Sequence, residues 1–288
     1  MTVGIAGHTV SGQSVGKKCC DMSVWSRNKF FVSFSENAAY WFGRQDYLLP
    51  PRRLIEGVGG GDYAKIGQEF FGHFTRIGGL KPEDRVLDVG CGCGRMAVPM
   101  IPFLSGAGEY HGFDIVPDAI IWSRKHIARK HSRFHFEVAE IYNKAYNPKG
   151  KIKASEYRFP YAENFFDFTF LTSVFTHMLA ADKERYLSEI ARTLKPGGRC
   201  MISYFLLNPE SKALIAQGAS SIQFQYPLDN CVTNNKDEPE GAIAFEESFI
   251  RQCFAKYGLN LIEPIHCGNW SGRKPWLSYQ DIVLAVKG

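Results

Sequence analysis

Residues 86–95 read VLDVGCGCGR, a short apolar strand that runs into a glycine-rich turn. This turn contains three glycines, Gly90, Gly92 and Gly94. A glycine lets the backbone pass close beneath a ligand, because it has no Cβ to occupy the ligand's space. A strand followed by such a turn and a helix therefore predicts a nucleotide-like ligand at the carboxyl end of a first parallel strand.

The spacing and charge of the turn indicate which ligand it holds. A dinucleotide site requires Gly-x-Gly-x-x-Gly, whereas the sixth position here is Arg95 and the third glycine comes one residue early. Asp88, two residues before Gly90, would repel a pyrophosphate. Its carboxylate suits a ligand that carries an ammonium and a sulfonium and has no phosphate, which is S-adenosylmethionine (SAM). The alternative is a glycine-rich turn in some other α/β protein.

The turn resembles motif I of the class I SAM-dependent methyltransferases, (V/L)LD(V/I)GCGxG. The resemblance extends over roughly residues 63–205, and it includes the phrases FPYAENFFD at 159–167 and LKPGG at 194–198. It implies a Rossmann-like α/β fold, with helices on both faces of a seven-stranded sheet in the order 3-2-1-4-5-7-6 and strand 7 antiparallel. It also implies that Asp88, Gly90, Gly92 and Gly94 bind SAM.

An acid ends the second expected strand, residues 110–113. Asp114 lies 24 positions after Gly90, and an acid about 20 residues beyond the glycines commonly holds the two hydroxyls of a ribose. This matches the second motif of the family, so Asp114 and Ile115 are expected to bind the cofactor. An N-cap role for Asp114 is the alternative, although Pro117 and Asp118 already supply a helix start.

The third expected strand, residues 134–138, leads to the adenine side of the site. Glu140 stands where the family usually has an aspartate that faces the adenine amino group. Glutamate keeps the acceptor and lengthens the side chain by one methylene. Ile141 is expected to pack on the adenine face.

The fourth expected strand, residues 166–171, flanks the point where the strand order reverses. Thr172 and Ser173 follow it and are expected to touch the cofactor. His177 is the candidate catalytic residue, because a side chain with a pKa near neutrality can act as a general base. In many relatives a histidine near this place only packs against the cofactor or the next helix, and that alternative stays open.

The remaining elements follow from periodicity and turn signals. We expect helices at 63–78, 96–104, 118–130, 181–193 and 244–257, and further strands at 199–205, 259–267 and 279–286. Residues 142–161 form a long basic connection, predicted to be a surface excursion beside the cofactor pocket. Residues 206–243 are polar and irregular, and are predicted to be a variable, substrate-recognising insertion.

The domain organisation is expected to be simple. Residues 1–62 form an N-terminal extension, either a cap over the active site or a plain packing extension, and residues 63–288 form the SAM-dependent methyltransferase domain with an insertion at about 206–243.

The amino-acid composition limits which partners the protein is expected to bind. The net charge of +5 is mild and its basic residues are dispersed, so no nucleic-acid partner is expected. No apolar run approaches the roughly 18–20 residues of a membrane span, and no signal peptide is recognised. Eight cysteines without a Cys-x-x-Cys pair favour a reduced, cytoplasmic protein and no metal.

The expected activity is methyl transfer from SAM to a small organic acceptor. Residues 171–174 read LTSV and lack the (Asp/Asn)-Pro-Pro-(Tyr/Phe) signature of enzymes that modify the amine of a nucleic-acid base. The many aromatic residues of the expected N-terminal cap, together with Trp270 and Trp276 near the far end of the sheet, favour a hydrophobic or natural-product acceptor. An RNA or protein acceptor, a relative that uses SAM differently and a binder without turnover remain alternatives. The sequence separates neither O-, N- and C-methylation nor oligomeric states.

Overall fold

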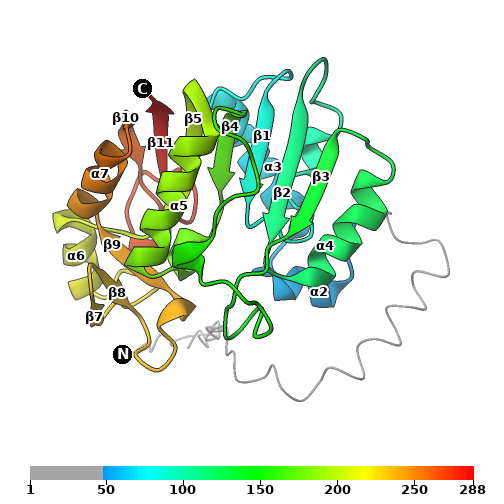
Figure 1. Cartoon of the computed structure of the whole chain (residues 1–288). Coiled ribbons are helices and arrows are strands. Elements are labelled where there is room, and N and C mark those ends of the chain that lie inside the picture. The colour runs from blue at the N-terminus through cyan, green and yellow to red at the C-terminus, as the bar shows by residue number, and fades with distance from the viewer. Residues whose placement is uncertain (1–47) are drawn as a thin grey trace, which may run out of the picture. The chain divides into compact units, whose positions relative to one another are not determined.

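A seven-stranded sheet forms the centre of the computed structural model, which describes residues 48–288. Its order is β10-β11-β5-β4-β1-β2-β3, and β11 runs antiparallel to β5 (Figure 1). The strands are β1 Arg85–Val89, β2 Glu109–Asp114, β3 Phe134–Val138, β4 Phe166–Leu171, β5 Leu194–Tyr204, β10 Leu259–His266 and β11 Asp281–Lys287. The predicted Rossmann-like fold, sheet order and antiparallel strand are thus confirmed.

Helices cover both faces of this sheet (Figure 1). The helices of the described chain are α2 Arg52–Gly57, α3 Tyr63–Arg76, α4 Pro117–Ser123, α5 Ala180–Thr193, α6 Pro209–Ala216 and α7 Glu247–Lys256. Among residues 48–288 no helix combines the length and apolar character needed to cross a membrane.

The central strands are apolar on both faces. β1 (RVLDV) and β4 (FDFTFL) are buried along almost their whole length, as expected for parallel strands between two helical layers. Leu87 packs in the core that contains Leu187 of α5, whereas its neighbour Val86 packs in the core that contains Phe74 of α3. Alternation along β1 therefore joins the two layers and fixes the position of the turn that follows it.

Two of the helices predicted in the first half of the chain differ from the structure. The helix expected at 96–104 is wrong: a 3₁₀ turn, Val98–Met100, and bends replace it. Pro99 and Pro102 each lack an N–H, and this run has too few donors for a regular helix. The helix expected at 118–130 is present as α4, which continues into a π-helical turn at Arg124–Ala128.

The insertion after β5 is more regular than predicted. The insertion contains α6 and contributes strands to a second sheet, whose order is β6-β9-β8-β7. The strands of this sheet are β6 Leu206–Leu207, β7 Tyr226–Leu228, β8 Cys231–Thr233 and β9 Ile243–Glu246. The helix expected at 244–257 is therefore too long at its start. Its first residues belong to β9, since their backbone groups pair with β6 and β8, and α7 begins only at Glu247.

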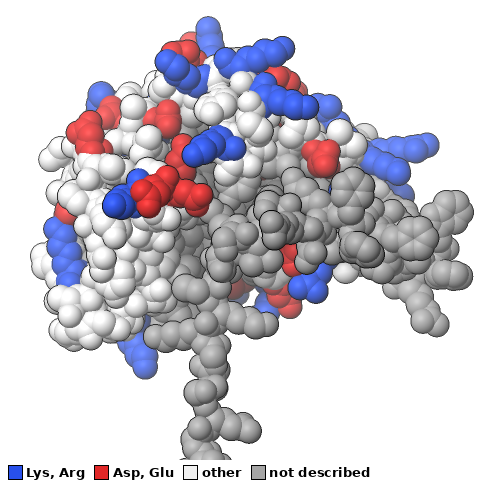
Figure 2. Space-filling model, turned by 90° about the horizontal axis from the view of Figure 1, so that it is seen from below, with Lys and Arg blue, Asp and Glu red and all other residues white. Residues whose placement is uncertain are grey.

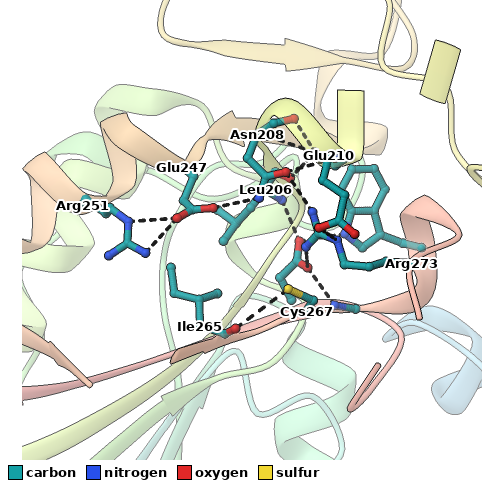
Figure 3. Close-up of polar contacts among 12 residues, drawn as sticks. Leu206, Asn208, Glu210, Glu247, Arg251, Ile265, Cys267 and Arg273 are labelled. Carbon is teal, nitrogen blue, oxygen red and sulfur yellow. Dashed lines mark hydrogen bonds and ion pairs between the residues drawn. The ribbon is translucent and has the colours of Figure 1, made fainter. Parts of the chain in front are cut away.

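A buried polar network fastens the insertion to the main sheet (Figure 3). Arg273, which is 5% exposed, donates from Nη2 to Asn208 Oδ1 at 2.8 Å and pairs with Glu210 at 3.0 Å. Its other neighbour is Asp281 in β11, which also accepts from Trp270 Nε1 at 2.7 Å. The start of α6 is thereby tied to the last strand of the sheet.

Candidate functional site

A cavity of about 490 Å³ lies where the carboxyl ends of β1, β2 and β4 meet. These ends point to the lower edge of Figure 1, where the connection after β3 and the end of α2 also gather. Of the predicted site residues, the cavity is lined by Gly90, Asp114, Ile115, Ile141, Thr172, Ser173 and His177.

The turn after β1 is held in place by backbone hydrogen bonds. Gly90 N and Cys91 N both donate to Phe113 O, at 2.9 and 3.1 Å. Gly90 has a φ of +80°, and a Cβ added there would lie 2.4 Å from Val174 Cγ2. Only glycine therefore fits between the turn and the Val174 side chain. Gly92 and Gly94 shape the same turn without lining the cavity.

Asp114 connects the end of β2 to this turn. Its Oδ2 accepts from Gly92 N at 2.7 Å, and its Oδ1 accepts from Val116 N at 2.8 Å. Burial raises the pKa of Asp114. Each carboxylate oxygen can accept more than one hydrogen bond, so Asp114 keeps acceptor capacity for a ligand while it organises the turn.

Asp88 lies below the turn and does not line the cavity. It is 1% exposed, and its Oδ2 accepts from Tyr110 Oη at 2.5 Å. Its Oδ1 is buried without a hydrogen-bond partner among the described residues. Burial raises the pKa of Asp88 to about 8.

The two residues predicted for the adenine side point in different directions. Ile141 is 2% exposed and lines the cavity, together with Ile115 and Val116. The side chain of Glu140 is exposed and lies outside the cavity lining. Its backbone carbonyl instead accepts from the amides of residues 151 and 152, which folds the long connection back on itself.

The connection after β3 forms one wall of the cavity. Its lining residues include Tyr142, Asn143, Tyr146 and Ser155. Asn143 Nδ2 donates to Glu240 Oε2 at 3.0 Å, so this connection reaches the insertion 97 residues further along the chain.

The end of β4 forms the opposite wall. Ser173 has a φ of +58°, and its amide and hydroxyl bond to Ser203 Oγ and Gln280 Oε1 at 2.8 and 3.0 Å. His177 Nδ1 lies 2.9 Å from the carbonyl oxygen of Glu240. Because a carbonyl only accepts, Nδ1 carries the proton and Nε2 keeps its lone pair. Burial lowers the pKa of His177 and so favours this neutral form.

Several lining residues were missed from the sequence. Asp182 and Tyr186 come from α5, and Glu240 comes from a 3₁₀ turn in the insertion. Asp182 and Tyr186 are four residues apart, so they share one face of α5. The four-residue spacing could have placed Asp182 and Tyr186 together, whereas nothing in the sequence places Glu240 beside them.

The N-terminal extension contributes at its end. Gly57, Val58 and Gly59 line the cavity, and a Cβ on Gly92 would lie 3.0 Å from Val58 Cβ. The rest of the cap expected at 1–62, up to residue 47, lies outside the described residues.

The cavity fits SAM by its chemistry. Gly90 lines the cavity with its backbone, and the Val174 side chain packs where a Cβ would otherwise lie. Asp114 offers oxygens to a ribose diol, and Ile115 and Ile141 offer an apolar surface to a base. Asp88 Oδ1 is buried beneath the turn without a hydrogen-bond partner within residues 48–288, and a pKa of about 8 keeps the carboxyl mainly neutral at pH 7. A cationic ligand above the turn would favour its ionised form.

Comparisons with known proteins agree with this geometry. Residues 80–256 match a family model described as a methyltransferase domain. The 27-O-demethylrifamycin SV methyltransferase of Amycolatopsis mediterranei (strain S699) is 28% identical over 144 residues, 49% of this chain. These residues span 47% of that relative, so the chain matches about half of its length.

Two solved structures share the fold. The PH0226 protein of Pyrococcus horikoshii OT3 matches with a TM-score of 0.54 and 15% identity, over 80% of this chain and 93% of that one. Magnesium protoporphyrin IX methyltransferase (ChlM) of Synechocystis PCC 6803, solved with bound S-adenosylhomocysteine (SAH), matches with a TM-score of 0.50 and 15% identity, over 82% and 93% of the two chains.

Proposed function

Because the chain belongs to the class I SAM-dependent methyltransferase family and takes SAM as its cofactor, we propose that it methylates a small organic acceptor in the cavity at the ends of β1, β2 and β4. One observation carries the proposal. The wall that holds Gly90 and Asp114 continues, within the same cavity, to His177, Asp182 and Tyr186. A cavity of about 490 Å³ has the size of a site that encloses small molecules.

The cofactor residues have separable roles in this proposal. Gly90, Gly92 and Gly94 shape the turn that lies along the methionine part. Asp114 accepts from the ribose hydroxyls, and Ile115 and Ile141 pack on the adenine. Thr172 and Ser173 contact the cofactor at the end of β4, and Asp88 ionises beneath the turn when the cationic cofactor binds above it.

The protein's contribution to the reaction is alignment and the exclusion of water. SAM supplies a methyl group on a sulfonium, which is already an excellent leaving group. The end of β4 and the connection after β3 hold the acceptor in line with that methyl group, which converts a bimolecular encounter into a positioned one. His177 accepts a proton at Nε2 where the acceptor must lose one.

Figure 2 views the end of the molecule to which the parallel strands point. On the described part of this face, Lys and Arg side chains are interspersed with Asp and Glu. Nucleic-acid surfaces carry clustered basic side chains that neutralise phosphates. The mixed charge supports a small acceptor over RNA.

The experiment offers SAM with a tritiated methyl group to the protein, together with a metabolite pool, total RNA or a protein extract in separate reactions. We expect labelled product and SAH with the metabolite pool. Label in RNA or protein and none in small molecules would contradict the proposal. SAH binding without transfer in any reaction would favour a SAM-binding protein that lacks turnover.

A further inference from the structure

We propose that the acceptor carries a cationic amino group, and that Asp182, Glu240 and Tyr186 hold it at the end of the cavity lined by α5 and the 3₁₀ turn Pro239–Gly241. This inference rests on the proposed function and names the class of acceptor. It makes no claim about which atom of the acceptor is methylated.

The charges that line this end of the cavity are acidic. Asp182 and Glu240 both line it, and neither forms an ion pair with a residue in the described part of the chain. The one Lys or Arg side chain in the described lining is Lys153, whose Nζ is 3.7 Å from Glu156. Two half-buried carboxylates without a cation are costly, because burial penalises an unpaired charge.

The two carboxyl groups lie close enough to affect each other. Burial raises the pKa of both, and the charge of Asp182 raises the pKa of Glu240 further. Neutral donors satisfy them in part: Asn143 Nδ2 donates to Glu240 at 3.0 Å, and Ser155 bonds to Asp182. A cation placed between them would relieve their repulsion and lower both pKa values.

Tyr186 provides an independent indication of a ligand. Its side chain is 4% exposed and lines the cavity, four residues from Asp182 on the same face of α5. No hydrogen bond to its hydroxyl is found among residues 48–288. The hydroxyl oxygen is not one of the fully buried unpartnered atoms of the described chain, so it is accessible, and because Tyr186 lines the cavity a polar group of a bound molecule can bond to it there.

Together these groups match an ammonium better than a neutral or anionic group. An ammonium has three donors and no acceptor. Asp182, Glu240 and the Tyr186 oxygen offer three acceptors from two elements. Charge-assisted hydrogen bonds are about twice as strong as neutral ones, so this end of the cavity would favour an amine over an alcohol of the same shape.

The test measures binding to the protein saturated with SAH at pH 7.5. The probes are matched pairs that differ in one group: cyclohexylamine and cyclohexanol, phenethylamine and 2-phenylethanol, glucosamine and glucose. We expect at least one amine to bind about tenfold more tightly than its hydroxyl counterpart. Asp182→Asn and Glu240→Gln should each reduce this preference by most of that factor, with SAH affinity within about twofold of wild type.

Glu238→Gln is the matched control, because this exposed side chain lies outside the cavity lining and should leave the preference intact. The proposal is overturned if every amine binds no better than its neutral counterpart, or if the preference survives in the Asp182→Asn/Glu240→Gln double variant. Failure of the proposed function is separate, since SAH binding and label transfer to neutral small molecules report on it directly.

Discussion

Replacing Lys183 with methionine is expected to stabilise the protein. Lys183 is completely buried in α5, with Nζ 3.9 Å from the centroid of the Phe249 ring and 3.6 Å from Cys253 Sγ. Within the described chain no carboxylate forms an ion pair with it. Its charge is therefore balanced mainly by a thiol and aromatic faces, with a smaller attraction from the Glu184 carboxylate.

The magnitude follows from the pKa. Burial lowers the pKa of Lys183 from 10.5 to about 8. At 1.36 kcal/mol for each pKa unit, keeping the charge at pH 7 costs about 3 kcal/mol. Methionine has a similar length and no charge, and it gives up cation–π contacts of roughly 1 kcal/mol. The free energy of unfolding should rise by about 2 kcal/mol.

The pH dependence gives a second readout. Between pH 8 and 10.5 the unfolded chain binds more protons at Lys183 than the folded chain does, because the folded pKa is the lower one. Wild-type stability should therefore gain a rising contribution as the pH increases through this window, and the Lys183→Met variant should lack it.

Urea unfolding at pH 7 and at pH 9.5, followed by circular dichroism, measures both effects. Lys256→Met is the control, because Lys256 is exposed and pairs with Glu184 at the surface. It should change the unfolding free energy by about 0.5 kcal/mol or less. A Lys183→Met variant less stable than wild type at pH 7 would refute the reasoning, since the rings and the thiol would then over-compensate the buried charge.

Three further variants test the site and its support. His177→Asn should lower kcat about a hundredfold if His177 is the base. Because burial lowers the pKa of His177, the wild-type kcat should stay constant as the pH falls to 6.5 and decline only below that pH. A pH–rate profile measures this dependence. Glu189→Gln should reduce the unfolding free energy by about 3 kcal/mol in urea titrations, because Glu189 is 3% exposed and pairs with Arg192 at 2.6 Å. Arg273→Met should cost a similar amount, about 3 kcal/mol, because it leaves Asp281 buried without its cation.

Each of these variants has a control and an opposing outcome. Unchanged kcat in His177→Asn at every pH would remove it as the base. Glu163→Gln and Lys274→Met alter exposed side chains and should be neutral within about 0.5 kcal/mol. Losses equal to those of the controls would mean that the buried networks contribute little to stability.

The parts of the site that lie at strand ends could be predicted from the sequence. The carboxyl ends of parallel strands share one edge of the sheet, so Gly90, Asp114 and Thr172 had to lie near one another once the strands were recognised. The structure brings all three to one cavity. Motif order along the chain was enough for this part of the fold.

The remaining parts of the site could not be predicted from the sequence. They depend on long-range packing or on the direction of single side chains, which hydrophobic periodicity does not indicate. Glu140 lies between Ala139 and Ile141, both buried, and its side chain points outward. Glu240 reaches the cavity only because the insertion folds into a second sheet and bonds to Asn143. The first residues of the helix predicted at 244–257 form strand β9 instead, because β9 pairs with β6 and β8.

Calorimetric titration of SAH into wild type, Asp114→Ala and Asp118→Ala tests the central claim, that SAM binds at the ends of β1, β2 and β4. Asp118 is an exposed acid in the first turn of α4, four residues beyond Asp114, and serves as the matched control. We expect one saturable site in wild type and in Asp118→Ala, and at least about tenfold weaker binding in Asp114→Ala, from the loss of charge-assisted hydrogen bonds to the ribose. Equal SAH affinity in all three proteins would contradict the account.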